Sequence, residues 1–121
     1  MIQMKNVTML LAILLLSGAT AAVAATRPSL HVSPTVVSPG GRVTVTGNAD
    51  GCLRGDAVTI ISRAFPGHGF AGIGAITAHV RVGGAFAASG RVRANARSGR
   101  YGITARCGGG NLGVIAYLRI R

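Results

Sequence analysis

Beyond about residue 26, apolar and polar side chains alternate with a period of two, and no stretch repeats with the helical period of 3.6. Glycine and proline interrupt this alternation repeatedly, and both residues favour turns. The pattern predicts an all-β protein whose antiparallel strands bury one face and expose the other. The predicted strands, in chain order, are residues 30–33, 42–47, 57–65, 75–82, 85–93, 99–107 and 112–120.

The inward-facing positions of these strands are mostly small, so the predicted core is thin. Phe65, Phe86 and Tyr101 are its bulkier members. In the fourth strand, the expected inward residues are Ile76, Ala78, Val80 and Val82. In the sixth they are Tyr101, Ile103, Ala105 and Cys107. In the seventh they are Val114, Ala116, Leu118 and Ile120.

Seven short strands within about 96 residues favour two sheets packed face to face. The predicted fold is a seven-stranded immunoglobulin-like antiparallel β-sandwich. In the immunoglobulin order, the first, second, fourth and fifth strands form one sheet, and the third, sixth and seventh form the other. A closed barrel is the main alternative.

The N-terminal segment has the features of a secretory signal peptide. One positive charge, Lys5, precedes an apolar run at residues 7–16, and Ala22-Val23-Ala24 fits the cleavage pattern. The run is too short to cross a bilayer comfortably, although a retained N-terminal anchor is an alternative. We expect residues 1–25 to be a cleaved signal peptide, residues 26–121 to form the sandwich, and the mature protein to be secreted without a transmembrane anchor.

The chain has two cysteines, Cys52 and Cys107. An even number of cysteines in an exported chain indicates a disulfide. Cys107 ends the sixth predicted strand, whereas Cys52 lies in the loop before the third. We therefore expect the bond to clasp two loops at one end of the sandwich, with a stabilisation of roughly 4 kcal/mol in the chain-entropy model.

The charge of the chain is strongly unbalanced, with a net charge of +11. Residues 26–121 contain twelve arginines, two aspartates, and neither lysine nor glutamate. Such a chain should bind polyanions, namely nucleic acid, anionic lipid headgroups or wall polymers that carry phosphate. The alternative is that the codon supply of a GC-rich genome, together with solubility, explains the arginines.

An outward-facing set of residues on the last two predicted strands is the candidate anion-binding site. It consists of Arg106, Tyr117, Arg119 and Arg121. Guanidinium groups bind phosphate through paired hydrogen bonds. Specific nucleic-acid recognition is not expected, because single-strand binders present several stacking aromatics. We expect a second outward-facing set of arginines on the other sheet. It consists of Arg42, Arg81, Arg91 and Arg93.

Residues suited to catalysis or metal binding are scarce. There is no glutamate, and Asp50 and Asp56 lie in one loop, where they are better explained as turn residues. No serine lies in a nucleophile elbow, and no glycine motif precedes a helix. The three histidines lack metal-ligand spacing. We predict no enzyme activity, no metal and no cofactor, and we interpret Arg54-Gly55-Asp56 as a turn, not as an integrin-binding tripeptide.

Five segments in order resemble the small secreted immunoglobulin-like domains of actinobacteria. They are residues 32–34, 37–47, 55–60, 84–86 and 98–111. The resemblance spans most of the mature chain and implies a cell-surface or extracellular module, without any activity or binding residue to transfer. Relatives often carry a wall-sorting tail, which this sequence lacks.

These observations favour a secreted, non-catalytic sandwich whose arginine-rich faces associate with anionic cell-envelope or extracellular material, such as wall polymers or lipid headgroups. Two further hypotheses remain open. One is a released cationic effector that acts on membranes. The other is a small-ligand carrier, similar to the sandwiches that hold enediyne chromophores, although those proteins have two disulfides and acidic surfaces.

Overall fold

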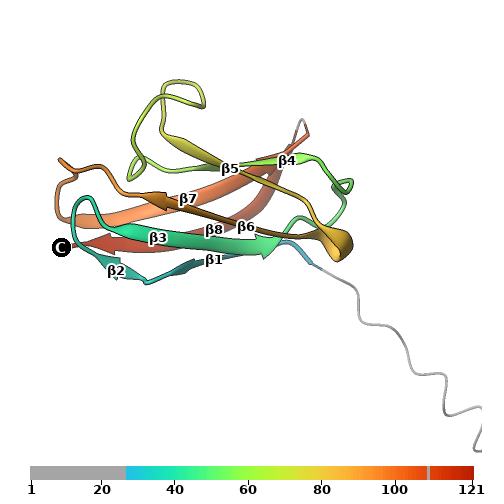
Figure 1. Cartoon of the computed structure of the whole chain (residues 1–121), viewed down its shortest axis with the longest axis horizontal. Coiled ribbons are helices and arrows are strands. Elements are labelled where there is room, and N and C mark those ends of the chain that lie inside the picture. Colours follow the sequence, from blue (N-terminus) through green and yellow to red (C-terminus); the bar gives the residue numbers. More distant parts are fainter. Residues whose placement is uncertain (1–26, 109) are drawn as a thin grey trace, which may run out of the picture.

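Two β-sheets pack face to face around one apolar core (Figure 1). The computed structural model describes residues 27–108 and 110–121. The predicted signal peptide therefore lies wholly outside the described residues. The all-β prediction and the sandwich-like arrangement of two sheets are confirmed. None of the helices in the described segments is long and apolar enough to span a membrane.

The smaller sheet has three antiparallel strands in the order β1-β3-β6. These strands are β1 (Ser29–Ser33), β3 (Arg42–Asn48) and β6 (Ala85–Arg91). The alternation in β3 buries Val43 and Val45 completely, whereas Arg42 and Thr46 face solvent. This alternation is typical of an antiparallel sheet that has one buried face and one solvent-exposed face.

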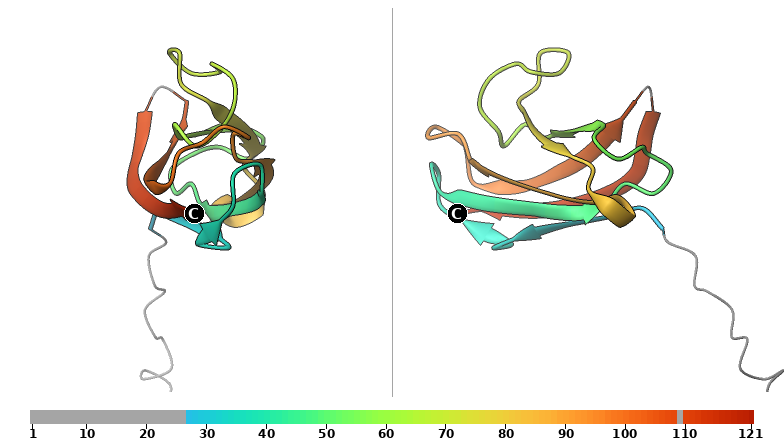
Figure 2. Two further views of the ribbon diagram at one scale, coloured as in Figure 1. Left: turned by 90° about the vertical axis from the view of Figure 1, so that its left-hand side faces the viewer. Right: turned by 45° about the vertical axis from the view of Figure 1, so that its right-hand side comes forward.

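The larger sheet has five strands in the order β2-β8-β7-β4-β5. The strands are β2 (Val36–Val37), β4 (Ala57–Ile61), β5 (Ala75–His79), β7 (Gly99–Cys107) and β8 (Gly110–Ile120). The short β2 runs parallel to β8, and the other neighbours are antiparallel. The long β7 and β8 hairpin curves across the whole sandwich (Figure 2) and forms the surface on which the candidate site lies.

The fourth predicted strand was assigned to the wrong sheet. Its counterpart β5 pairs with β4, with Ala78 opposite Val58, and therefore extends the larger sheet. Alternation shows that one side of a strand is buried, but it does not show against which sheet. At this edge Ile76 of β5 lies against Gly90 of β6, so the two sheets approach each other here.

The predicted count of seven strands is also wrong, because the sheets contain three and five strands. The additional strand, β2, follows Pro34 and is only two residues long, too short for a pattern to reveal. It is held by hydrogen bonds from the N–H of Arg119 to the carbonyl of Thr35 (2.8 Å) and from the N–H of Arg121 to the carbonyl of Val37 (3.0 Å).

Several strand ends differ from the predicted ranges, and the third and fourth predicted strands differ most. The strand predicted at residues 57–65 ends at Ile61, because the N–H of Phe65 donates to the carbonyl of Ser62 (3.1 Å) and closes a turn. Val82 was expected to face the core, but it is 73% exposed because it begins the short 3-10 helix η2 (Val82–Gly84).

The core lies between the sheets, and its largest fully buried side chains include the predicted Phe65 and Phe86. Phe86 packs against Gly47 of β3, where an added Cβ would lie only 2.6 Å from the ring. The absence of a side chain at residue 47 therefore lets the aromatic ring reach the strand backbone.

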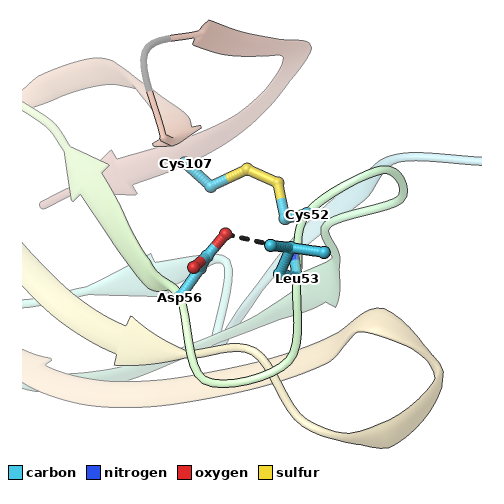
Figure 3. Close-up of a disulfide and its surroundings, with 4 residues drawn as sticks. All are labelled: Cys52, Leu53, Asp56 and Cys107. Atoms are coloured by element: carbon cyan, nitrogen blue, oxygen red, sulfur yellow. Dashed lines mark hydrogen bonds between the residues drawn. A yellow bond between two sulfur atoms is a disulfide. The ribbon is translucent and has the colours of Figure 1, made fainter.

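The disulfide joins Cys52 to Cys107 at one end of the sandwich (Figure 3). Cys52 lies in the loop between β3 and β4, and Cys107 is the last residue of β7. Their Cα atoms are 6.4 Å apart, a separation that a disulfide spans. The Cys52 loop is closed further by the N–H of Leu53, which donates to Oδ2 of Asp56 (3.0 Å). The expected clasp on the end of the sandwich is confirmed.

Candidate anion-binding surface

The predicted site residues lie on neighbouring strands, but the structure separates them into two places. Tyr117 and Arg119 of β8, followed by Arg121, are exposed on the outer face of the larger sheet. Arg106 of β7 lies opposite Asn111, near the other end of the hairpin. Its Cζ is 5.3 Å from the ring centroid of Phe70, in the loop between β4 and β5. Arg106 therefore does not belong to the same site as the other three residues.

Arg100 completes the cluster, although it was not among the predicted anion-binding residues. It lies directly opposite Arg119 in the β7 and β8 register, roughly 20 Å along the strand from Arg106. The Cζ atom of Arg100 is 4.2 Å from the ring centroid of Tyr117, a cation–π contact. The alternation of side chains does predict that Arg100 points outward, because it directly precedes the inward-facing Tyr101.

Gly102 makes room for this arrangement. It lies opposite Tyr117 in the ladder, and an added Cβ would be 3.0 Å from Ile115 and 3.9 Å from Tyr117. With no side chain at this position, both neighbours occupy the space above the strand. We call Arg100, Tyr117, Arg119 and Arg121 the arginine–tyrosine face.

The electrostatics of this face favour an anionic ligand. Arg100 and Arg119 are like charges at directly opposed positions, a pairing that destabilises a sheet unless an anion lies between them. Nη2 of Arg121 donates to the hydroxyl of Ser38 at 3.3 Å. Ile115, which is 50% exposed, lies beside Tyr117 above Gly102, and Val36, which is 44% exposed, pairs with Arg119. The face can therefore hold phosphate groups on guanidinium and an uncharged backbone on Tyr117 and its aliphatic neighbours.

The second predicted arginine set does not form a row. Arg42 and Arg91 are direct partners on β3 and β6, and Nη1 of Arg91 donates to the carbonyl of Gly40 (3.2 Å). Arg81 precedes η2 at the opposite end of the sheet. Arg93 follows β6 and turns toward the loop between β4 and β5, where its Nε donates to the carbonyl of Phe65 (2.9 Å).

The Arg54-Gly55-Asp56 tripeptide lies in a turn, as predicted. Gly55 has a φ of +91°, its N–H donates to the carbonyl of Val80 (2.8 Å), and the carboxylate of Asp56 accepts the hydrogen bond from Leu53. The carboxylate of Asp56 therefore accepts a hydrogen bond within the turn itself. Across residues 27–108 and 110–121, no three histidine, cysteine or acidic side chains gather into a group that could hold a metal ion.

Comparisons with known proteins indicate the fold alone. No protein-family model matches the chain. No curated protein matches it either. Among solved structures, it is similar to the alkylpurine DNA glycosylase AlkC of Pseudomonas fluorescens bound to DNA containing an abasic site analog, with a TM-score of 0.53 and 16% identity. The match covers 77% of this chain but only 29% of the glycosylase, so the likeness concerns a part of that enzyme.

Proposed function

We propose that this protein is a secreted, non-catalytic immunoglobulin-like sandwich that associates through its arginine–tyrosine face with anionic cell-envelope or extracellular material. The observation that carries the proposal is the placement of Arg100, which lies opposite Arg119 and 4.2 Å above the ring of Tyr117. Like charges on adjacent strands beside an exposed aromatic ring form a surface suited to an extended polyanion.

The immunoglobulin-like assignment is supported by six of the seven predicted strands, which lie in the expected sheets, and by one tyrosine. The hydroxyl of Tyr101, near the start of β7, donates to the carbonyl of Arg97 (2.8 Å) in the preceding loop. In immunoglobulin-type sandwiches a tyrosine near the start of the equivalent strand bonds back to the backbone in this way. The disulfide supports secretion, because such bonds persist in oxidising compartments.

The face suits a polymer with phosphate groups on an aliphatic backbone better than it suits a nucleic acid. Its single aromatic ring, Tyr117, is already covered on one side by Arg100, whereas single-strand binders stack successive bases on several rings. Both acidic residues, Asp50 and Asp56, lie in the loop that carries Cys52. That loop lies at the opposite end of the sandwich from the start of β7, where Arg100 is the second residue, so the aspartates do not neutralise the face (Figure 1).

The test is binding of poly(glycerol phosphate) by variants matched in charge. Arg119→Gln with Arg121→Gln removes two charges from the face, and Arg42→Gln with Arg81→Gln removes two from elsewhere. We expect the face variant to lose about tenfold or more in affinity, since hydrogen bonds to charged groups contribute roughly 1.5–3 kcal/mol each. The control should lose much less. Equal losses in the two variants would show that only net charge matters and would contradict the proposal.

A further inference from the structure

A groove lined by arginines lies beside the arginine–tyrosine face. Its larger part, with a volume of about 540 Å³, is lined by Arg63, Arg93, Arg97 and Tyr101, with Ile73 on one wall. A second hollow of about 390 Å³ shares Arg63, Ile73 and Tyr101 with the first, and is also lined by Arg100. We call the two hollows together the basic groove.

The two walls of the basic groove are joined by one backbone hydrogen bond and one side-chain hydrogen bond, both donated by Arg93. One wall is the segment between β4 and β5, and the other is the loop between β6 and β7. The N–H of Arg93 donates to the carbonyl of Ala64 (2.8 Å), and its Nε donates to the carbonyl of Phe65 (2.9 Å). The hydroxyl of Tyr101 donates a hydrogen bond to the carbonyl of Arg97. The protein's own hydrogen bonds therefore order the backbone that carries the arginines, which lowers the entropic cost of binding.

The charge of the basic groove is unbalanced. Neither hollow is lined by an acidic residue, because both aspartates lie in the Cys52 loop. Within residues 27–108 and 110–121, no hydrogen bond or ion pair engages the side chains of Arg63 and Arg97. Arg93 is held half-buried by its bond to Phe65, and its guanidinium remains at the groove wall. Three guanidinium groups around one hollow attract an anion, and phosphate matches their planar donor geometry.

Arg100 connects the basic groove to the arginine–tyrosine face, because it lines the second hollow and also lies over Tyr117. We propose that the basic groove is a phosphate-binding site in which Arg63, Arg93 and Arg97 hold one phosphate group of a phosphodiester chain. The chain then passes Arg100 and continues across the arginine–tyrosine face. This inference rests on the proposed function for the polymer, while the affinity of the groove for phosphate can be measured separately.

The lining of the groove favours an aliphatic phosphodiester chain over a nucleic acid. Tyr101 is its one aromatic side chain, and this residue is half-buried with its hydroxyl bonded to Arg97. The groove therefore lacks a free ring on which a base could stack. Gly72 and Ile73, which lie on the same wall as Arg63, add no further charge and leave space for a polymer backbone.

The first experiment uses inorganic pyrophosphate as a small probe at low salt, monitored by the NMR signals of the arginine Nε–H groups. Saturable shifts are expected at Arg63, Arg93 and Arg97. The variant Arg63→Gln with Arg97→Gln should bind pyrophosphate at least about tenfold more weakly than Arg42→Gln with Arg81→Gln. Shifts spread evenly over all arginines, or equal affinities in the two variants, would overturn the assignment of the groove. Thermal unfolding of each variant establishes that it is folded.

The second experiment separates this inference from the proposed function. Poly(glycerol phosphate) should lose affinity in both the groove variant and the face variant, whereas a loss confined to Arg119→Gln with Arg121→Gln would leave the proposed function standing and refute the groove. Pyrophosphate binding at the groove without any polymer binding would support the groove and refute the proposed function. Single-stranded DNA should bind more weakly than poly(glycerol phosphate) of equal charge. Tighter binding of DNA would overturn the choice of an aliphatic chain.

Discussion

Tyr101 has a structural role and lines the candidate groove. Its ring packs against the core at the start of β7, and its hydroxyl closes the loop between β6 and β7 by bonding to the carbonyl of Arg97. That loop carries Arg97 itself, and Arg93 lies at its start. One hydrogen bond therefore sets the position of a groove wall, which links the stability of the sandwich to the geometry of the proposed phosphate site.

We predict that Tyr101→Phe lowers the free energy of unfolding by about 1 kcal/mol, the net value of one intramolecular hydrogen bond. Chemical denaturation measures this change. The matched control is Tyr117→Phe, because the hydroxyl of Tyr117 has no hydrogen-bond partner within residues 27–108 and 110–121, and its side chain is 46% exposed. Indistinguishable stabilities for the two variants would show that the Arg97 contact contributes nothing.

At the scale of elements, the β7 and β8 hairpin organises both proposed binding surfaces. Its register places Arg100 opposite Arg119 and moves Arg106 to the far end, beside Phe70. The same hairpin is fixed at its Cys107 end by the disulfide to the Cys52 loop. The disulfide therefore stabilises the end of the sandwich opposite the arginine–tyrosine face, and its loss should change stability more than binding.

Removal of the disulfide, as Cys52→Ala with Cys107→Ala, should reduce the free energy of unfolding by about 4 kcal/mol, because the denatured chain loses a constraint on a long loop. Urea denaturation of the native protein with and without a reductant measures the same quantity independently. The double variant should be insensitive to reductant. A native protein whose urea midpoint does not fall on reduction would refute a stabilising role for this bond.

At the scale of the whole molecule, charge is distributed unevenly. The two aspartates lie at the disulfide end, whereas Arg63, Arg93, Arg97, Arg100 and Arg119 gather around the opposite half of the larger sheet. If the proposed function holds, this distribution should turn the β7 and β8 face toward an anionic surface. Association driven by such a distribution of charge weakens as salt shortens the range of the interaction.

We predict that the protein remains with the cell envelope when cultures are fractionated at low salt and is released at about 1 M salt, where the Debye length falls to about 3 Å. Quantitative immunoblotting of the envelope and medium fractions measures this partition. The Arg119→Gln with Arg121→Gln variant should be released at lower salt than the native protein. If the native protein is found wholly in the medium at low salt, the envelope proposal is wrong.

The sequence by itself determined the class of the fold, the identity of most strands and the pairing of the cysteines. Period-two alternation predicts strands because successive side chains point to opposite faces, and this holds whatever the neighbours are. The exposed positions of Tyr117 and Arg119 and the burial of Phe86 follow from the same rule, whereas Phe65 is buried from a turn beyond the end of β4. Two cysteines allow only one intramolecular pairing, and their loop positions predicted the clasp at one end.

Only the tertiary structure decided which residues lie together. Alternation shows which side chains of a strand are buried, but it does not show how the strand is aligned with its neighbours or to which sheet it belongs. For this reason β5 was assigned to the wrong sheet and Arg106 was grouped with Arg119. The partnership of Arg100 with Arg119 depends on the β7 and β8 register. The basic groove depends on loops that bring Arg63 close to Arg97, residues far apart in the chain, and no local pattern encodes such a contact.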